Sequence, residues 1–204
     1  MAMNPRLLRP RATGYTPVDA DARAYVAAVR TADGQALENN VAKAIDVFVQ
    51  GCKTDGTWNA LTHCALLAGP RTIAGCCVAL KGTAPTSNAF LAADYTRKTG
   101  LKGSTANTKF LNTNVNHNTF TQNDFHMCVW VTEPMPVNGT QRYIGAGSNG
   151  TGASTIFGNG GGLQFQNQTS AAQTPGASTD QTTGLIGTTR SGSTTFTMRW
   201  GANS

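Results

Sequence analysis

The sequence predicts a mainly β protein, in which an antiparallel β-sandwich follows an extended N-terminal arm and a small α-helical module. Apolar residues recur at helical spacing only before residue 69. From residue 70 onward, short apolar or alternating runs are separated by Gly, Asn and Pro turns, at intervals of about 8 to 20 residues that are typical of a sandwich. We therefore divide the chain into an arm at 1–17, a helical module at 18–69 and a sandwich domain at 70–204.

The helical module is expected to contain two amphipathic helices and a short third one. The first should begin at an N-cap of Asp19 or Asp21 and stop before Gly34. An apolar stripe from Ala36 to Val49 predicts the second helix, which should end at Gly51 or continue briefly. Residues 58–67 are expected to add the third.

Eight strands are expected in the sandwich domain. At 126–132, Met127, Val129 and Val131 alternate with Cys128, Trp130 and Thr132, and residues 194–200 alternate in the same way. Strands of this pattern bury one face and expose the other. The expected strands are 72–80, 110–111, 126–132, 142–145, 154–157, 162–166, 183–189 and 194–200.

Charge is sparse in this chain. Asp, Glu, Lys and Arg make up 13% of the 204 residues, which is roughly half the usual share. The net charge of +6 is spread over small groups instead of one basic stripe, so we expect no nucleic-acid partner. Neither a membrane-spanning apolar run nor the apolar core of a secretory signal occurs, which predicts a soluble protein made in a cytoplasm, with no membrane partner.

The N-terminal arm combines two prolines with a small basic group. Arg6, Arg9 and Arg11 flank the apolar pair Leu7 and Leu8. This composition favours an extended peptide that lies along another protein, so we take these five residues as docking residues. A disordered tail is the alternative.

The segment 94–126 is dense in Asn and Thr and poor in acidic residues. That composition favours turns and exposed loops over a catalytic pocket. Its basic residues Arg97, Lys98, Lys102 and Lys109 are interpreted as a solvated loop, with contact to an anionic glycan or phosphate as the alternative.

Metal, cofactor and redox chemistry find little support in the sequence. No Cys-x-x-Cys pair occurs and no His stands at metal-ligand spacing, so we expect reduced, buried cysteines and neither a metal nor a cofactor. Residues 145–150 match G-x-G-x-x-G, but the strand-like residues that follow predict a hairpin or loop instead of a phosphate-binding site. The cysteines are Cys52, Cys64, Cys76, Cys77 and Cys128.

Catalytic residues are not expected either. The only acidic residues after residue 60 are Asp94, Asp124, Glu133 and Asp180, and their spacing proposes no carboxylate pair for acid–base catalysis. Asp124 with His126 is the most suggestive combination, and a turn-capping Asp beside a packing His explains it more simply. The chain is therefore predicted not to be an enzyme.

Motifs along most of the chain carry a resemblance to a known family. The clearest are DYTRKTGLKG at 94–103, KFLNTN at 109–114, QNDFH at 122–126, YIGAG at 143–147 and GLIGTTR at 184–190, together with 4–11, 24–29, 33–37 and 51–56. They resemble a family of tailed-phage virion proteins that is frequent in cyanophages. The resemblance implies a lectin-like sandwich of the concanavalin A or laminin G type, in a phage appendage or tail fibre.

Relatives of this type usually continue past the equivalent of Trp200 with further strands. We expect either that a neighbouring chain completes the sheet here or that a shorter form serves a different structural role, because an incomplete edge invites uncontrolled pairing.

We therefore predict a non-enzymatic virion protein that docks to other virion proteins through its N-terminal region and binds host-surface glycan through its loops. Amides and hydroxyls would supply hydrogen bonds, and an aromatic such as Tyr95, Phe120 or Phe125 would stack on a sugar ring. A purely architectural capsid, neck or baseplate protein is the main alternative, and a polysaccharide-degrading enzyme is the third. We expect a homo-oligomer of undetermined order. The candidate glycan-binding residues are Tyr95, Arg97, Asn114, Asn116, Asn118, Phe120 and Asn123.

Overall fold

The protein is mainly β, with strands in antiparallel sheets. The computed structural model describes residues 14–104, 108–134, 142–147, 152–159, 162–169, 172–173, 183–194 and 196–201. The chain divides into two compact units. Unit 1 comprises Met1–Lys102 and Leu111–Asn114, and unit 2 comprises Gly103–Phe110 and Val115–Ser204.

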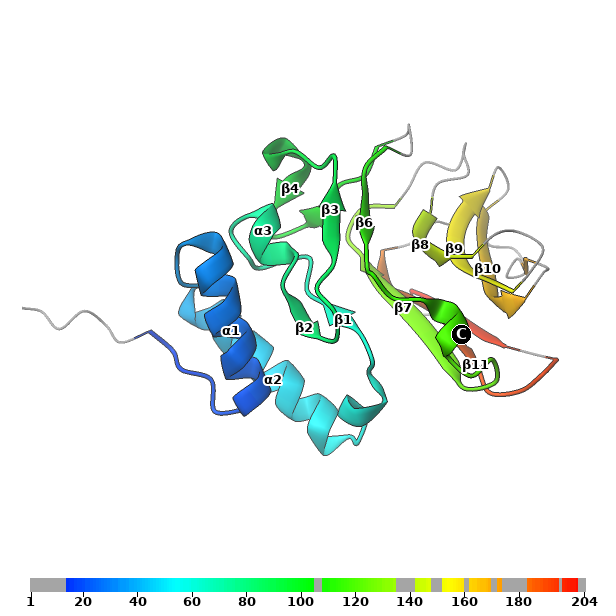
Figure 1. Ribbon diagram of the computed structural model, residues 1–204, viewed down its shortest axis with the longest axis horizontal. Helices are drawn as coiled ribbons and strands as arrows, with labels where there is room; N and C mark the ends of the chain where they lie inside the picture. Colours follow the sequence, from blue (N-terminus) through cyan, green and yellow to red (C-terminus); the bar gives the residue numbers. More distant parts are fainter. Residues whose placement is uncertain are drawn as a thin grey trace, which may run out of the picture. The chain divides into compact units, whose positions relative to one another are not determined.

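Unit 1 is built on two helices that lie against each other (Figure 1). Helix α1 (Ala20–Asp33) starts where the Asp19 carboxylate accepts two backbone N–H groups, and it ends at Gly34, whose φ of 67° suits glycine. Helix α2 (Asn39–Thr54) follows. Both predicted helices are confirmed. Their apolar stripes share one core that consists of Ala22, Tyr25, Val29, Leu37, Ile45, Val49, Trp58 and Leu80.

The rest of unit 1 differs in part from the sequence prediction. Residues 58–67 form only the 3-10 turn η2 (Trp58–Ala60) and the short strand β1 (Cys64–Ala65). The predicted strand at 72–80 is wrong at its start, because these residues form α3 (Ile73–Cys76) before β2 (Ala79–Lys81). The other short elements are β3 (Thr86–Asn88), η3 (Ala92–Asp94), β4 (Tyr95–Thr96), β5 (Gly100–Leu101) and β6 (Phe110–Asn112), paired as β3–β6 and β4–β5.

A tertiary contact accounts for the helical start of that segment. The Asp33 carboxylate accepts the backbone N–H groups of Arg71 and Thr72 at 2.6 and 2.9 Å. Thr72 in turn caps α3 by accepting the N–H of Gly75. The predicted boundary between residues 69 and 70 falls inside unit 1, where β1 pairs with β2 across it.

Unit 2 contains two three-stranded antiparallel sheets, in the orders β10-β9-β8 and β12-β11-β7. Ile156, Leu163 and Phe165 of the first sheet share a buried core with Val131 and Ile186 of the second. Complete burial of such side chains stabilises by about 1.5–3 kcal/mol each. The elements are η4 (His117–Thr119), β7 (Phe125–Val131), β8 (Arg142–Ala146), β9 (Ala153–Asn159), β10 (Gly162–Thr169), β11 (Gly184–Arg190) and β12 (Thr197–Trp200).

The alternation predicted for β7 is confirmed. Met127, Val129 and Val131 face the core, while Cys128 and Trp130 are exposed. The predicted strands of unit 2 recur with ends shifted by a few residues. The strands β8 and β9 on either side of the 145–150 motif pair antiparallel, and residues 148–151 between them lie outside the described residues.

The cysteines are all free, as expected, but they differ in burial. Cys76 is buried and three others are half-buried. The expected burial is wrong for Cys128, because it lies on the outward register of β7.

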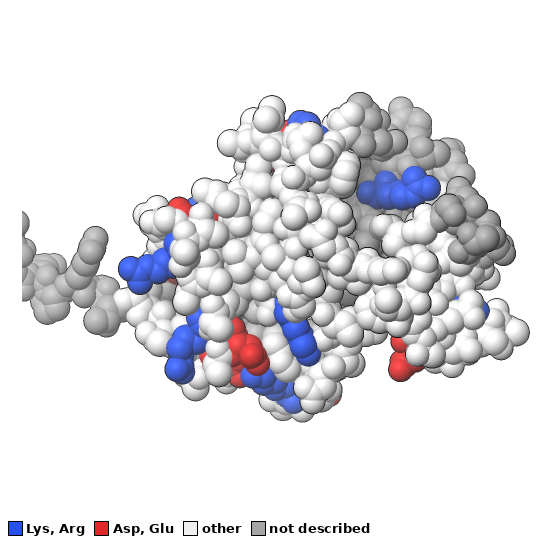
Figure 2. Space-filling model, viewed as in Figure 1, with Lys and Arg blue, Asp and Glu red and all other residues white. Residues whose placement is uncertain are grey.

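Charged side chains are unevenly placed on the surface. In the view of Figure 2 they gather mainly over the helices, and most of the remaining described surface is uncharged. Some of them form ion pairs, as where Lys53 lies 2.7 Å from Asp19 and 2.6 Å from Asp21.

Candidate functional site

The predicted glycan-binding residues are divided between the two units. Tyr95, Arg97 and Asn114 belong to unit 1, and the other four belong to unit 2. The Tyr95 hydroxyl donates to the carbonyl of Pro70, and the Asn114 side-chain amide donates to the carbonyl of Ala84 at 3.0 Å. These two side chains therefore use polar groups in contacts within unit 1.

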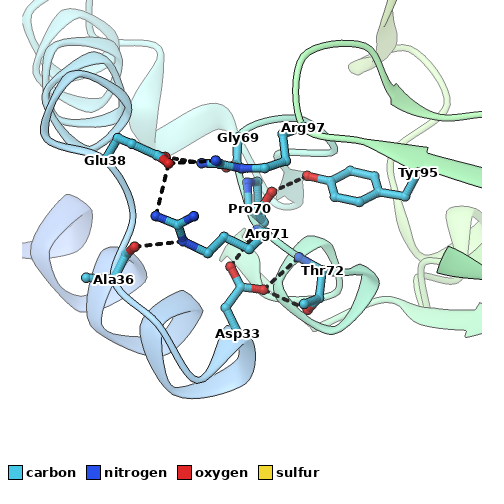
Figure 3. A network of polar contacts seen from close by, with 9 residues as sticks. All are labelled: Asp33, Ala36, Glu38, Gly69, Pro70, Arg71, Thr72, Tyr95 and Arg97. Atoms are coloured by element: carbon cyan, nitrogen blue, oxygen red, sulfur yellow. Dashed lines mark hydrogen bonds and ion pairs between the residues drawn. The ribbon is translucent and has the colours of Figure 1, made fainter. Parts of the chain in front are cut away.

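Arg97 belongs to a network of polar contacts in unit 1 (Figure 3). Two of its guanidinium nitrogens donate to the Glu38 carboxylate, which also lies 3.0 Å from Nη2 of Arg71. The hydrogen bonds from Arg97 lower the pKa of Glu38 to about 2. Asp33 adds a second carboxylate beside Arg71. The network thus holds two positive and two negative charges.

A cavity of about 370 Å³ lies beside this network. Because the guanidinium groups of Arg71 and Arg97 already bind Glu38, little charge is left for a ligand, and we interpret the network as structural. The cavity is lined by Arg71, Thr72, Ile73, Ala74, Ala92, Tyr95 and Arg97.

The four predicted residues of unit 2 lie in the segment that leads into β7. Asn116 caps η4 by accepting the backbone N–H of Asn118 at 3.1 Å, and Asn118 and Asn123 are exposed. Phe120 stacks on Phe125 with 5.6 Å between the ring centroids. This segment therefore presents exposed amides beside a half-buried aromatic pair.

The outward face of sheet β12-β11-β7 carries a second candidate site, which the sequence analysis did not name. Trp130 on β7 is 70% exposed. Strand pairing places Leu185 opposite Trp130, and it places Gly187 opposite both Cys128 and Arg199. We call this surface the outer face. Its residues are His126, Cys128 and Trp130 on β7, Leu185, Gly187 and Thr189 on β11, and Thr197 and Arg199 on β12.

The outer face is an open sheet surface with a glycine at its centre. Strands are about 4.8 Å apart and alternate residues about 6.7 Å apart, so the eight positions cover roughly 10 by 13 Å of backbone. A Cβ atom on Gly187 would lie 2.9 Å from Cβ of Cys128, so the pairing requires glycine at the centre. The platform offers an indole ring, hydroxyl groups of Thr189 and Thr197, and the Arg199 guanidinium.

The sequence contained part of the signal for this site. The alternation at 126–132 places Trp130 on the face opposite Met127 and Val129, which makes a large aromatic side chain point to solvent. Which residues of β11 and β12 stand beside it depends on strand register, which the alternation alone does not give.

The structure also bears on the expectations for Asp124, for metal sites and for membrane spans. Asp124 lies in a turn in which its N–H donates to the carbonyl of Thr121 at 3.1 Å. Among the residues that the structure describes, no three His, Cys, Asp or Glu side chains gather as a metal site. No helix in the described ranges is long and apolar enough to cross a membrane. The docking residues Arg6, Leu7, Leu8, Arg9 and Arg11 lie outside the described residues.

No family model, curated protein or solved structure matches the chain. The geometry of the outer face, together with the motifs of the sequence, is therefore the basis for a functional assignment.

Proposed function

We propose that this protein is a virion component of a tailed phage that binds host-surface glycan through the outer face of unit 2. The motif resemblance supports the virion assignment. The observation that carries glycan binding is Trp130, a tryptophan that is 70% exposed on the outward face of a sheet. Large exposed apolar side chains in a patch mark interaction sites on proteins.

The chemistry of the outer face suits a sugar. An indole ring packs on the apolar face of a pyranose, and burial of about 100 Å² of ring surface is worth roughly 2.5 kcal/mol. The hydroxyls of Thr189 and Thr197 both donate and accept hydrogen bonds, as sugar hydroxyls require. The exposed amides of Asn118 and Asn123 provide further hydrogen bonds in the segment before β7.

In this proposal the two packed sheets of unit 2 are the lectin-like part of the molecule. Unit 1 and the arm residues Arg6–Arg11 attach it to other virion proteins, and the protein works as a homo-oligomer. The proposed activity is binding without catalysis. A polysaccharide-degrading enzyme would need opposed carboxylates, and the outer face contains neither Asp nor Glu.

One observation favours a purely architectural role in the capsid, neck or baseplate instead. Leu185 lies opposite Trp130, and an aromatic beside an aliphatic side chain is also what a protein–protein contact buries. In that case the outer face would contact only other virion proteins.

Substitution of the tryptophan tests the proposal. Binding of the full chain to isolated host envelope polysaccharide should fall at least tenfold in Trp130→Ala and less in Trp130→Phe, because a smaller ring still stacks. Phe48→Ala is the matched control, since Phe48 is an aromatic on α2 that is 44% exposed. Unchanged polysaccharide binding by a folded Trp130→Ala variant would falsify the proposal and favour the architectural role.

A further inference from the structure

We propose that the outer face selects acidic glycans, through contact of Arg199 with a carboxylate or sulfate group on the sugar chain. This inference rests on the proposed function and adds the chemical class of the ligand.

Within the described residues, Arg199 differs from Arg71, Arg97 and Arg190 because its guanidinium has no partner there. Within the part of the chain that the structure describes, no hydrogen bond or ion pair engages its guanidinium, and the residue is exposed. By contrast, Arg71 and Arg97 pair with Glu38, and Arg190 donates to four backbone carbonyls. The charge of Arg199 is thus available to a ligand.

The position of Arg199 allows it to act together with Trp130. Arg199 pairs with Gly187, Gly187 pairs with Cys128, and Trp130 is the next outward residue along β7. Two strand spacings and one pleat separate the two backbone positions by about 12 Å. Gly187 places no side chain between them, and both side chains are long. A sugar stacked on the indole would therefore bring its acidic substituent, or that of the next sugar, within reach of the guanidinium.

The charge pattern around the platform favours a negative ligand. None of the eight outer-face residues is Asp or Glu. The acidic residues nearest along β7 are Asp124 and Glu133, which lie beyond its two ends. Arg199 is on β12, and β11 separates that strand from β7. The net charge of +6 has the same sign as Arg199. A guanidinium also donates two parallel N–H bonds to carboxylate, sulfate or phosphate oxygens, and these bonds are stronger than those to a neutral sugar hydroxyl because the acceptor is charged.

Matched pairs of polysaccharides test the selectivity. We would titrate the full chain by calorimetry with polygalacturonate against its methyl ester, and with dextran sulfate against dextran, at 0.15 and 0.5 M salt. The acidic member of at least one pair should bind at least tenfold more tightly, which corresponds to about 1.4 kcal/mol. The pair that shows the difference identifies the acidic group.

Variants separate Arg199 from overall charge. Arg199→Gln should lower acidic binding to the level of the uncharged member and leave uncharged binding as it was. Arg199→Lys should fall between the two, because it keeps the charge and loses the planar fork. Arg30→Gln is the control, since it removes one exposed arginine from α1 in unit 1 and should change nothing. Thermal unfolding verifies that each variant is folded.

The outcomes distinguish the two proposals. Equal binding of acidic and uncharged members, or equal effects of Arg199→Gln and Arg30→Gln, overturns acidic selectivity. The proposed glycan site still stands in that case if Trp130→Ala loses binding. Absence of binding to every polysaccharide, including host envelope material, overturns both proposals. If the chain binds another protein and no polysaccharide, both proposals are also overturned.

Discussion

The hydroxyl of Tyr15 donates a 2.6 Å hydrogen bond to Oδ2 of Asp46, a carboxylate on α2 with no exposed surface. Asp46 also accepts the backbone N–H groups of Val18 and Asp19 at 2.9 Å each. Burial alone would raise the pKa of Asp46, but the hydrogen bonds from Tyr15, Val18 and Asp19 outweigh it and lower that pKa. One side chain therefore fixes the segment that leads into α1.

Removal of this carboxylate should weaken unit 1. Asp46→Ala leaves the donors of Tyr15, Val18 and Asp19 without this partner, so we expect the Tm of unit 1 to fall by roughly 5–10 °C. Tyr15→Phe removes only one of the hydrogen bonds and should lower the Tm less. Circular dichroism during heating measures both. Equal Tm values for the two variants would show that the backbone contacts contribute nothing.

Acid should destabilise unit 1 through Glu38. Its pKa is lowered from 4.5 to about 2 in the folded protein by Arg97, so the ion pair stabilises the fold above pH 4.5, and this contribution is lost as the pH falls toward 2. Asp46, with its lowered pKa, acts in the same direction. In Glu38→Gln the urea midpoint of unit 1 should depend less on pH between 5 and 2. An unchanged pH dependence in this variant contradicts the prediction.

Two glycine-to-alanine substitutions should act in opposite directions. A Cβ atom on Gly75 would lie 2.2 Å from Oδ1 of Asp33, so Gly75→Ala should displace the carboxylate that fixes α3 and destabilise by about 1–3 kcal/mol. A Cβ atom on Gly51 in α2 meets nothing within 4 Å, so Gly51→Ala should stabilise by about 0.5–1 kcal/mol. Chemical denaturation compares them, and the same sign for both would refute the structural reason.

The buried Arg190 should be essential to unit 2. Its guanidinium donates to the carbonyls of Asn167, Gln168, Gly192 and Ser193 at 2.6 to 3.0 Å. Arg190→Met leaves these acceptors without the donor and should destabilise unit 2 by about 3 kcal/mol. Arg190→Lys should recover only part of this, because an ammonium does not reproduce the fork of donors. Full stability of the Met variant in urea would be incompatible with this role.

Modification of Cys128 should report on the outer face. It is the exposed cysteine of the five, and it lies on β7 between His126 and Trp130. A maleimide adduct there should lower glycan binding at least tenfold by covering the platform. Cys128→Ser treated with the same reagent should bind normally. Normal binding by fully labelled wild-type protein would place the glycan elsewhere.

Elements with local signals were predictable from the sequence, and elements fixed by distant contacts were not. Asp19 and Gly34 delimit α1 with their own side chain and backbone, and the alternation in β7 marks its buried face. The helix α3 depends on Asp33, which lies 38 residues before Arg71, so its apolar sequence resembled a strand.

The residues of the candidate site were likewise predictable where the signal was local, and not where it depended on distant contacts. The Asn-rich composition located an exposed segment before β7, and the alternation placed Trp130 in solvent. Composition does not reveal that Arg97 pairs with Glu38, 59 residues away. Nor does it give the register that brings Arg199 onto the same face as Trp130.

The chain leaves unit 1 after Lys102, returns to it at Leu111–Asn114, and then leaves it again. A recombination junction at residue 103 would remove most of β6, the partner of β3, from unit 1, and a junction at residue 115 would leave Gly103–Phe110 of unit 2 behind. Neither unit can therefore be inherited intact through a single crossover. Under the proposed function, a change in the glycan that unit 2 binds can instead arise by point substitution at solvent-facing sheet positions, which tolerate substitution.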